Sequence, residues 1–369
     1  MTMKNNLGIY IHIPFCVRKC PYCDFYSCIS DSSVKSKYVK SLIEDISSYK
    51  DRRLSADSVY FGGGTPTSLT SAQLCGILDA VKESFSLSDD CEITTEANPC
   101  TVDFMYLCEL RQAGFNRISF GVQSAVDSEL VSLGRLHSYE QAENAVLQAQ
   151  KAGFDNISCD LMIGVLGQTE DTLANSVDKL CSLPITHISA YMLKIEDGTP
   201  YDCERIRNSI VTDDTQAEFY LSAVKRLSEN GFMQYEISNF CKDGRMSRHN
   251  MKYWKLCDYI GFGPSAHSFF EGRRFYNERD INGYISDRSS VFRIEDSSSD
   301  AFCEYTMLSL RLSEGISRDR YVSLGGSQKK FDSLSKKLVQ EGMAKSNDDR
   351  LCLTPKGFLL SNSIILGLL

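Results

Sequence analysis

Residues 112–119 read Gln-Ala-Gly-Phe-Asn-Arg-Ile-Ser, and residues 151–158 repeat this phrase as Lys-Ala-Gly-Phe-Asp-Asn-Ile-Ser. In both copies an amphipathic segment stops at a glycine, which tolerates the left-handed conformation found at helix ends. The chain then turns directly into an apolar, β-branched run typical of a strand. Repeated helix-to-strand units of this kind predict an α/β fold in which helices cover a parallel sheet.

The same alternation of strand and helix patterns extends in both directions from these two phrases, up to about residue 230. Six βα units fit this part of the chain, so we predict an open (β/α)6 partial barrel and not a complete eight-stranded one. The predicted strands are 8–13, 57–61, 92–96, 117–121, 156–161 and 187–192, and the predicted helices are 34–51, 71–85, 102–113, 139–152 and 170–182.

The rhythm changes after residue 232, which divides the chain into three expected parts. Residues 1–232 form the barrel, and residues 233–297, rich in polar and aromatic clusters, form an extension that closes it. Ser297–Ser299 is expected to be a linker. Residues 298–369 are expected to form a small winged-helix-like α+β domain, with helices at 299–312, 316–323 and 327–341 and a two-stranded wing within 342–353.

Composition excludes several classes of protein. The 369 residues include 40 Lys and Arg against 48 Asp and Glu, a net charge of −8, so we expect no nucleic-acid partner, even for the winged-helix pattern. No apolar run is long enough to cross a bilayer and the N-terminus has no signal-peptide pattern, which predicts a cytoplasmic protein. Most of the 15 cysteines are scattered singly and are expected to be buried as small apolar residues, not paired in disulfides.

One group of cysteines is clustered. Cys16, Cys20 and Cys23 form a CxxxCxxC motif directly after a predicted strand, with Tyr22 before the last cysteine. Three thiolates at this spacing can each bind one iron of a [4Fe–4S] cube and leave the fourth iron open to another ligand. The alternatives are a structural zinc site, which would recruit Cys28 as its fourth ligand, and a redox-active dithiol.

A second motif is the glycine run Phe-Gly-Gly-Gly-Thr-Pro-Thr at residues 61–67, which follows the second predicted strand. Without side chains, the backbone can approach a charged group closely. A phosphate-binding loop is the alternative, but the run lacks the Gly-Lys-Ser/Thr ending and the acidic residue that such sites use.

Together these motifs resemble the radical S-adenosylmethionine (SAM) family. The resemblance implies a [4Fe–4S] cluster on Cys16, Cys20 and Cys23, whose open iron binds SAM. Without this resemblance, most of the polar residues named in the next sentence would be interpreted as helix caps or surface ion pairs. For His267, a packing role in the barrel and a SAM contact are equally compatible with the sequence. The resemblance implies SAM contacts at Gly63, Gly64 and Thr65 of the glycine run and at Tyr10, Tyr22, Glu96, Gln123, Arg135, Asp160 and His267.

Within that family, the order of motifs over the first 270 residues resembles the anaerobic coproporphyrinogen III oxidase family, which comprises oxidases and haem chaperones of the HemW type. Phe25 stands where the oxidases have a fourth cysteine, and only fifteen residues precede Cys16. Residues 249–254 match the HNxxYW signature of the chaperones. One departure is Leu166, which stands where relatives have a proline, so the turn at residues 164–169 is expected to be looser.

The HNxxYW segment is a candidate haem site. Imidazole is a common ligand of haem iron and aromatic rings offer flat walls, so His249, Asn250, Tyr253 and Trp254 are the residues implied to bind haem. The alternative is a buried aromatic cluster with a satisfied histidine. His12 and His187 lie in strand patterns and are expected to be structural, whereas His137 has no assignment.

The resemblance therefore implies a radical SAM haem chaperone with a [4Fe–4S] cluster, SAM and haem as cofactors. Its implied partner is an acceptor haemoprotein, for example a membrane-associated respiratory oxidase, and a homodimer is a further partner to test. The main alternative is an oxygen-independent coproporphyrinogen III oxidase, an enzyme of porphyrin biosynthesis. A protein that only senses iron–sulfur or redox status is the third hypothesis.

Overall fold

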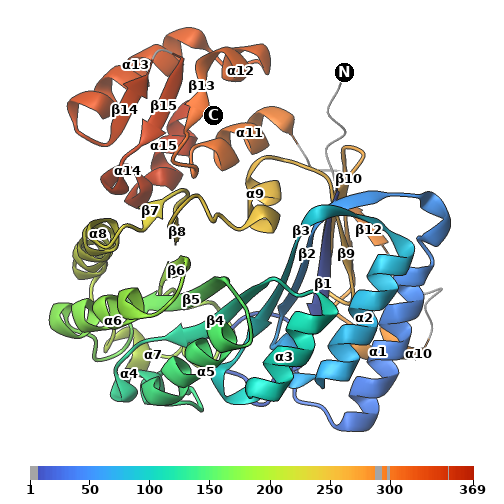
Figure 1. The fold of residues 1–369 in the computed structure, drawn as a ribbon. Helices are drawn as coiled ribbons and strands as arrows, with labels where there is room; N and C mark the ends of the chain where they lie inside the picture. The colour runs from blue at the N-terminus through green and yellow to red at the C-terminus, as the bar shows by residue number, and fades with distance from the viewer. Residues whose placement is uncertain (1–6, 287–292, 297–299, 348) are drawn as a thin grey trace.

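The computed structural model describes residues 7–286, 293–296, 300–347 and 349–369, and it contains a twelve-stranded and a three-stranded sheet (Figure 1). The strand order of the large sheet is β12-β11-β10-β9-β1-β2-β3-β4-β5-β6-β8-β7. The expected linker at residues 297–299 lies outside the described residues. Within the described residues, no helix combines the length and the apolar character that crossing a bilayer requires.

Six parallel strands and their helices form the centre of the large sheet, which confirms the open (β/α)6 partial barrel. Gly114 ends α3 at φ 112° and Gly153 follows α5 at φ 99°, so both copies of the repeated phrase make the expected left-handed turn into a strand. The strands are β1 (Leu7–Ile13), β2 (Ser55–Gly63), β3 (Ser86–Ala97), β4 (Arg117–Gln123), β5 (Asn156–Ile163) and β6 (His187–Met192). The helices are α1 (Ser32–Ser47), α2 (Ser71–Ser84), α3 (Phe104–Ala113), α4 (Asp127–Ser132), α5 (Tyr139–Lys151), α6 (Glu170–Ser182), α7 (Glu204–Arg207) and α8 (Asp213–Glu229).

The two faces of this sheet differ in chemistry. Successive side chains of a strand point to opposite faces, and one face is apolar and packs under the helices, as Ile9, Ile11 and Ile13 of β1 do. The other face is polar. In register across β1 and β2 it carries Tyr10 opposite Tyr60. Parallel sheets are usually apolar on both faces, so this polar face indicates a functional interior.

Residues 233–296 extend the sheet at both edges. β8 pairs with β6 at one edge and β9 pairs with β1 at the other, and β7 and β12 end the strand order without pairing with each other. The extension therefore lengthens the partial barrel instead of joining its edges, while α9 packs against β1 and β2. The elements are β7 (Met233–Gln234), β8 (Asn239–Cys241), α9 (Arg248–Trp254), β9 (Tyr259–Phe262), β10 (His267–Phe270), β11 (Arg273–Asn277), α10 (Ile281–Ser286) and β12 (Arg293–Asp296).

The C-terminal part has a core of its own around Tyr321, Phe331 and Leu351 and lies on the side of α9 and β7–β8 (Figure 1). Its sheet has three strands, one more than the expected wing, because the short β13 also pairs with β15. The elements are α11 (Ala301–Ser309), β13 (Ile316–Ser317), α12 (Arg318–Ser323), α13 (Gln328–Gln340), β14 (Ala344–Asn347), β15 (Arg350–Leu353), α14 (Pro355–Leu359) and α15 (Ser361–Leu368).

Candidate functional site

The three clustered cysteines lie on a loop at the carboxyl end of β1. Backbone hydrogen bonds close the base of the loop, since Cys16 N donates to Cys28 O (2.9 Å) and Cys28 N donates to Pro14 O (2.8 Å). Burial raises the pKa of the Cys23 thiol, and the neighbouring Cys20 and Cys16 thiols raise it further. The three thiols therefore lie on one loop, near enough for Cys16 and Cys20 to act electrostatically on Cys23.

Two side chains from other βα units contact these thiols. Thr65 Oγ1 donates to Cys16 Sγ (3.6 Å), and Arg135 Nη1 donates to Cys20 Sγ (3.5 Å). Arg135 Nη2 also donates to Gly121 O (2.6 Å), which holds the guanidinium in place. A cation beside a thiol favours the thiolate, which is the form that binds iron.

Cys28 is separate from this group. Its Sγ lies 3.2 Å from Ser30 Oγ, and its backbone forms the base of the loop. Within the described residues, no three Cys, His, Asp or Glu side chains are close enough to hold a single metal ion. Cys28 is thus not among the thiols that act on Cys23, whereas a four-ligand zinc site would need it beside the other three.

The glycine run brings the end of β2 against the base of the cysteine loop. Gly64 N donates to Ile13 O (2.9 Å) and Thr65 N donates to Phe15 O (2.7 Å). A Cβ on Gly64 would lie 2.8 Å from Phe15 O, and Gly63 has φ 111° with its Cβ position 2.5 Å from the His12 ring. Gly64 is required because backbone packs on backbone beside the cysteine loop, and Gly63 because its left-handed φ and the His12 ring leave no place for a side chain.

The segment after β6 covers the cysteine loop. Tyr201 N donates to Pro21 O (3.1 Å), and the Tyr201 ring lies 6.2 Å from the ring of Tyr22. The Tyr201 hydroxyl donates to Ser132 O at the end of α4. These contacts surround Tyr22 with aromatic and apolar side chains and shield that side of the loop from water.

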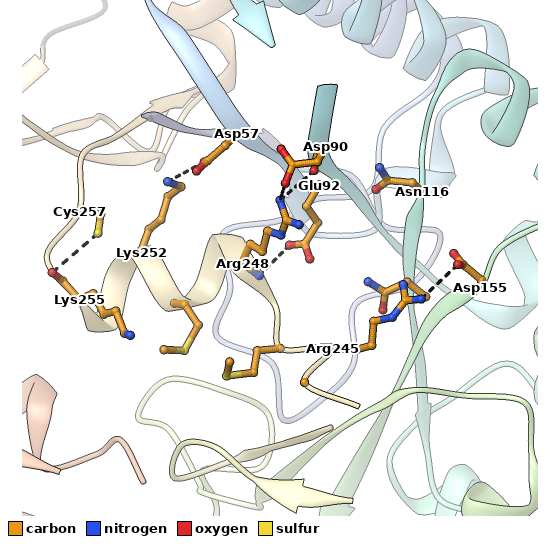
Figure 2. A pocket seen from close by; sticks show the side chains of 14 residues that line it. Asp57, Asp90, Glu92, Asn116, Asp155, Arg245, Arg248, Lys252, Lys255 and Cys257 are labelled. Atoms are coloured by element: carbon orange, nitrogen blue, oxygen red, sulfur yellow. Dashed lines mark hydrogen bonds and ion pairs between the residues drawn. The ribbon is translucent and has the colours of Figure 1, made fainter. Parts of the chain in front are cut away.

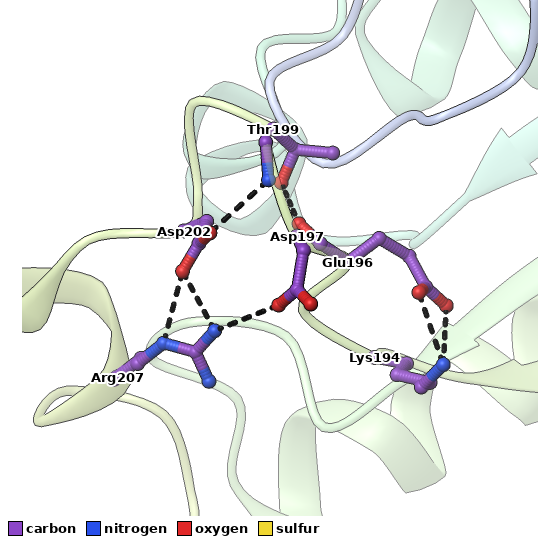
Figure 3. Close-up of polar contacts among 7 residues, drawn as sticks. Lys194, Glu196, Asp197, Thr199, Asp202 and Arg207 are labelled. Carbon is purple, nitrogen blue, oxygen red and sulfur yellow. Dashed lines mark hydrogen bonds and ion pairs between the residues drawn. The ribbon is translucent and has the colours of Figure 1, made fainter.

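Surface ion pairs link several residues of this covering segment (Figure 3). Arg207 pairs with Asp202 (2.6 Å) and with Asp197 (3.6 Å), and Lys194 pairs with Glu196 (2.8 Å). All of them are at least partly exposed, so each pair contributes little to stability. The buried aromatic contacts of Tyr201, not these charges, anchor the segment on the cysteine loop.

Two carboxyl groups occupy the polar face of the sheet near its carboxyl end. Tyr60 donates to Glu96 Oε1 (2.8 Å), and Ser119 donates to Asp160 Oδ1 (3.4 Å). Burial raises the pKa of Glu96 to about 7, and the charge of Asp160 adds to the rise. Burial also raises the pKa of Asp160, to about 6, against the opposing effect of Arg117. Two desolvated acids on one face favour a cationic ligand.

Gln123, at the end of β4, is held in an unusual conformation. It has φ 75°, in the left-handed region that side chains rarely adopt, and it is buried. Its Oε1 has no hydrogen-bond partner among the described residues, and neither has Arg135 Nε. Buried polar atoms normally have partners, so this pair of atoms indicates a place where a ligand completes the bonding.

Tyr10 lies on the polar face but points toward other side chains of the sheet. A hydrogen bond of 3.0 Å joins its hydroxyl to His12 Nδ1, and His12 Nε2 is 3.0 Å from Tyr26 O on the cysteine loop. Burial lowers the pKa of His12 to about 4, so it is neutral. Tyr10 and His12 therefore link the sheet interior to the cysteine loop.

His267, in contrast, is exposed at the start of β10, with its ring stacked on Tyr276 (5.1 Å between centroids). Two other histidines are buried. A hydrogen bond of 3.1 Å links His137 Nε2 and Val122 O, and His187 contacts Ser158 (2.7 Å) and a tyrosine hydroxyl. His187 is structural, as expected, and the unassigned His137 supports the end of β4.

Sequence reasoning missed several residues of the polar face, above all Tyr60, Arg117 and Tyr191. Arg117 is 2 % exposed and acts electrostatically on both acids described above. A sequence signal for them exists, because each strand places polar residues at every second position where a parallel strand is usually apolar. Examples are Ser58 and Tyr60 in β2, Glu92, Thr94 and Glu96 in β3, Arg117, Ser119 and Gln123 in β4, and His187, Ser189 and Tyr191 in β6.

The HNxxYW segment forms α9, which lies at the opposite, amino-terminal end of the strands. His249 is fully buried, and its ring bonds to Ser58 Oγ through Nδ1 (3.0 Å) and to Tyr253 through Nε2 (2.8 Å). Burial lowers the pKa of His249 to about 3. His249 thus has the environment of the buried, satisfied histidine that was the alternative to a haem ligand, while Asn250 and Trp254 are half-buried.

The residues at the carboxyl end fit the cofactors that the motifs imply. The three thiols lie on one loop, where Arg135 contacts Cys20. Gln123 Oε1, without a partner among the described residues, and the acids Glu96 and Asp160 offer acceptors to a ligand with cationic groups. SAM carries both a sulfonium and an ammonium group. This donor set is appropriate for an iron–sulfur cluster with SAM beside it.

Comparison with known proteins gives the family. The model of the Radical SAM superfamily matches residues 10–180, and that of the HemN C-terminal domain matches residues 297–360. A protein named heme chaperone HemW from Bacillus subtilis is 34% identical over 367 residues, which cover 96% of this chain and 97% of that protein. The chain belongs to the HemW family of radical SAM proteins. A second HemW, from Escherichia coli K12, is 34% identical over 336 residues, 88% of each chain.

Among solved structures, the fold is similar to that of the coproporphyrinogen III oxidase HemN from Escherichia coli, described as a radical SAM enzyme. The TM-score is 0.83, and the match covers 99% of this chain and 90% of that chain. Sequence identity is 19%, so this similarity concerns the fold alone. It agrees with the partial barrel and the additional C-terminal domain of the HemW-family chain.

Proposed function

We propose that this HemW-family chain is a radical SAM haem chaperone, which binds a [4Fe–4S] cluster, SAM and haem and transfers the haem to an acceptor haemoprotein. The observation that carries the proposal is the similarity, over nearly the full length, to proteins named heme chaperone HemW. Phe25, 66% exposed on the cysteine loop, supports it, because the related oxidases have a cysteine at this position.

Each part of the carboxyl end has a role in this proposal. Cys16, Cys20 and Cys23 would hold the cluster, and the Arg135 guanidinium donates to the sulfur of Cys20. The cluster and SAM, when bound, supply one-electron chemistry, and the protein contributes binding and exclusion of water.

The remaining residues of the carboxyl end orient SAM. Gln123 Oε1 would accept a hydrogen bond from SAM, and Glu96 and Asp160 would offer their carboxyl groups to its cationic groups. Tyr22, covered by Tyr201, keeps solvent away from the cluster. SAM binding should therefore lower the pKa of both acids, because a nearby cation favours the carboxylate.

The proposal is tested by reconstituting the cluster under anaerobic conditions and titrating haem into the full-length protein while following the Soret band. Saturable, stoichiometric binding and subsequent transfer to membranes that contain a haem-depleted respiratory oxidase are the expected results. Conversion of coproporphyrinogen to protoporphyrinogen with release of methionine would overturn the proposal in favour of the oxidase. Failure to bind haem would overturn it as well.

A further inference from the structure

A pocket of about 590 Å³ beside α9, at the amino-terminal end of the strands, has charged groups that are already paired (Figure 2). Arg248 pairs with Asp90 (2.9 Å), and Arg245 pairs with Asp155 (3.3 Å). Acidic and basic side chains are equally frequent among its described lining residues. The lining therefore does not favour a ligand of either charge.

Arg117, at the start of β4, is in a different state. Its side chain is 2% exposed, yet it makes no ion pair and donates no side-chain hydrogen bond to any described residue. Its Nε is buried without a partner. A guanidinium group has five N–H donors, and burial of a charge without compensating bonds costs free energy. A buried arginine in this state indicates a place where a ligand completes the bonding.

A second open group lies beside it. Thr94 is directly opposite Arg117 in the pairing of β3 with β4, so both side chains point to the polar face of the sheet. Thr94 is fully buried, and its Oγ1 has no partner within the part of the chain that the structure describes. Two neighbouring strands thus carry unsatisfied polar side chains at the same position.

The charge of Arg117 lies on the inner side of the partial barrel, between its strands. Burial raises the pKa of Tyr60 on β2 and of Asp160 on β5, and the charge of Arg117 opposes both rises. Burial lowers the pKa of His187 on β6, and Arg117 adds to that fall. A single charge that acts on β2, β5 and β6 is close to the centre of the polar face.

The acids of this face do not use Arg117 as a hydrogen-bond donor. Glu96 accepts from Tyr60 (2.8 Å), and Asp160 accepts from Ser119 (3.4 Å). Both carboxyl groups are also the groups assigned above to the cations of SAM. The donors of Arg117 are therefore available to an anion.

Solvent reaches this part of the barrel. Tyr60, Glu96 and Asp160 are partly exposed although they lie on the inner face. Tyr191, on the same face of β6 as His187, is 41% exposed. A ligand can enter past Tyr191, and the Arg117 side chain has no hydrogen bond to break when it turns toward that ligand.

The chemistry of the two open groups favours a carboxylate. A guanidinium binds a carboxylate through two parallel N–H···O bonds, and a threonine hydroxyl can donate a third. Glu96 and Asp160 would repel a dianionic phosphate more strongly than a monoanion. The single positive charge of Arg117 therefore matches the single negative charge of a carboxylate.

We propose that Arg117 and Thr94 bind the carboxylate of a second organic ligand, inside the barrel and beside the residues assigned to SAM. The inference goes beyond the proposed chaperone function, because it neither requires haem nor places it. Since Arg117 acts electrostatically on Glu96 and Asp160, the carboxylate and SAM would occupy neighbouring positions.

The test is a calorimetric titration of the full-length protein with its cluster reconstituted, at constant ionic strength. Sodium propionate is the carboxylate probe, and propionamide has nearly the same shape without the charge. We expect saturable binding of one propionate per chain. Propionamide and inorganic phosphate should bind at least about 10-fold more weakly, because they lack the matched charge.

Variants assign the binding to the two residues. Arg117→Met should weaken propionate binding about 10- to 100-fold, since it removes charged hydrogen-bond donors. Arg117→Lys should recover only part of this loss, because an ammonium group cannot form the two parallel bonds. Thr94→Val keeps the shape of the side chain and should weaken binding several-fold. Arg320→Met, at an exposed arginine of the C-terminal part, is the matched control and should bind as wild type does.

The outcomes decide the proposal even if one variant is unstable. Wild type that binds no propionate, or binds propionamide equally well, overturns it. Unchanged propionate binding by Arg117→Met, shown to be folded by urea unfolding, overturns it too. If Arg117→Met does not fold, wild-type affinity in Thr94→Val overturns the site. Tighter binding of phosphate than of propionate would overturn the carboxylate class. The haem titration described above is independent of these results, so failure of the proposed function is distinguishable.

Discussion

The two ends of the central sheet carry similar buried polar residues, but these residues differ in how many of their hydrogen bonds are made within the protein. At the carboxyl end, Gln123 leaves Oε1 unpaired and Glu96 faces the charge of Asp160. At the amino-terminal end, His249 uses both ring nitrogens, and Glu92 Oε1 accepts from two backbone N–H groups of α9, at 2.9 and 3.3 Å. The first end leaves polar atoms available to a ligand, whereas the contact of α9 with the sheet at the second end has its hydrogen bonds complete.

This difference shows why a polar residue inside a barrel is not by itself evidence of chemistry. A buried polar group whose bonds are complete stabilises the fold, and a buried polar group with an open bond is a candidate for binding. By this criterion His249 belongs to the framework, although it lies in the segment that most directly suggests haem.

The largest expected effect is at the carboxyl end. Replacing Cys16, Cys20 and Cys23 together by Ala should abolish the cluster completely, because each thiolate binds a different iron. Iron and sulfide analysis after anaerobic reconstitution, with the visible absorption of the cluster, measures this. Cys28→Ala is the control and should retain the cluster, since the Cys28 thiol contacts Ser30. A cluster in the triple variant would contradict the assignment of these three ligands.

The next effect concerns the amino-terminal end. His249→Ala should lower the free energy of unfolding by about 2–4 kcal/mol, because it leaves a cavity and removes the partners of Ser58 and Tyr253. Urea unfolding measures the change. The exposed His267 is the matched control, and His267→Ala should change stability by less than about 0.5 kcal/mol. Equal losses of stability in the two variants would show that His249 does not contribute more to the fold than an exposed histidine does.

A pH effect of intermediate size is expected from Glu96. Its pKa in the folded protein is about 7 against an ordinary value of 4.5. Between these two pH values the folded protein keeps the Glu96 proton, whereas the unfolded chain has already lost it. Stability of the SAM-free protein should therefore fall as pH rises from about 4.5 to about 7. The fall due to Glu96 should be about 1–3 kcal/mol, since about 1.4 kcal/mol per pKa unit is reduced by solvent at this partly exposed side chain.

Urea unfolding of wild type and Glu96→Gln at several pH values checks this prediction. The variant should show a flatter stability profile over that range, because its amide does not titrate. Glu140→Gln, on the exposed surface of α5, is the control and should keep the wild-type profile. Identical stability profiles for all three proteins would show that folding does not raise the pKa of Glu96 in the absence of a ligand.

The smallest expected effect is in the segment that covers the cysteine loop. Arg207→Ala should reduce the free energy of unfolding by less than about 1 kcal/mol, because its pairs with Asp202 and Asp197 are exposed. Arg205→Ala, on the same short helix, is the control for loss of a surface arginine. A loss well above that seen for Arg205→Ala would mean that charges, and not Tyr201, anchor the segment.

Local sequence determined much of the fold. The glycines of the two repeated phrases predicted the helix-to-strand turns that Gly114 and Gly153 make, because a left-handed helix end strongly favours glycine. Hydrophobic periodicity predicted β6 with both of its ends and α6 over its full length. The short β13 was missed, since a strand of two residues carries no periodic pattern.

The candidate site was predictable only where chemistry follows from local spacing. CxxxCxxC brings three thiols together on one loop, so the ligand positions follow from the sequence alone. Tyr60, Arg117 and Tyr191 were missed because their roles depend on side chains of neighbouring strands, far away in sequence. Whether His249 has a free nitrogen likewise depends on Ser58, which lies 191 residues earlier in the chain.

The sequence by itself determined the order of the six central strands and of five of their helices, the three-cysteine loop and the glycine turns, because these depend on residues close together in the chain. Only the tertiary structure decided which polar groups remain open. Packing of α9 against the amino-terminal ends of β1 and β2 closes the bonds of His249, and strand pairing across β3 to β5 puts Glu96 and Asp160 on one face. Satisfaction of a buried polar group is a property of its neighbours in space, and spacing along the chain does not specify it.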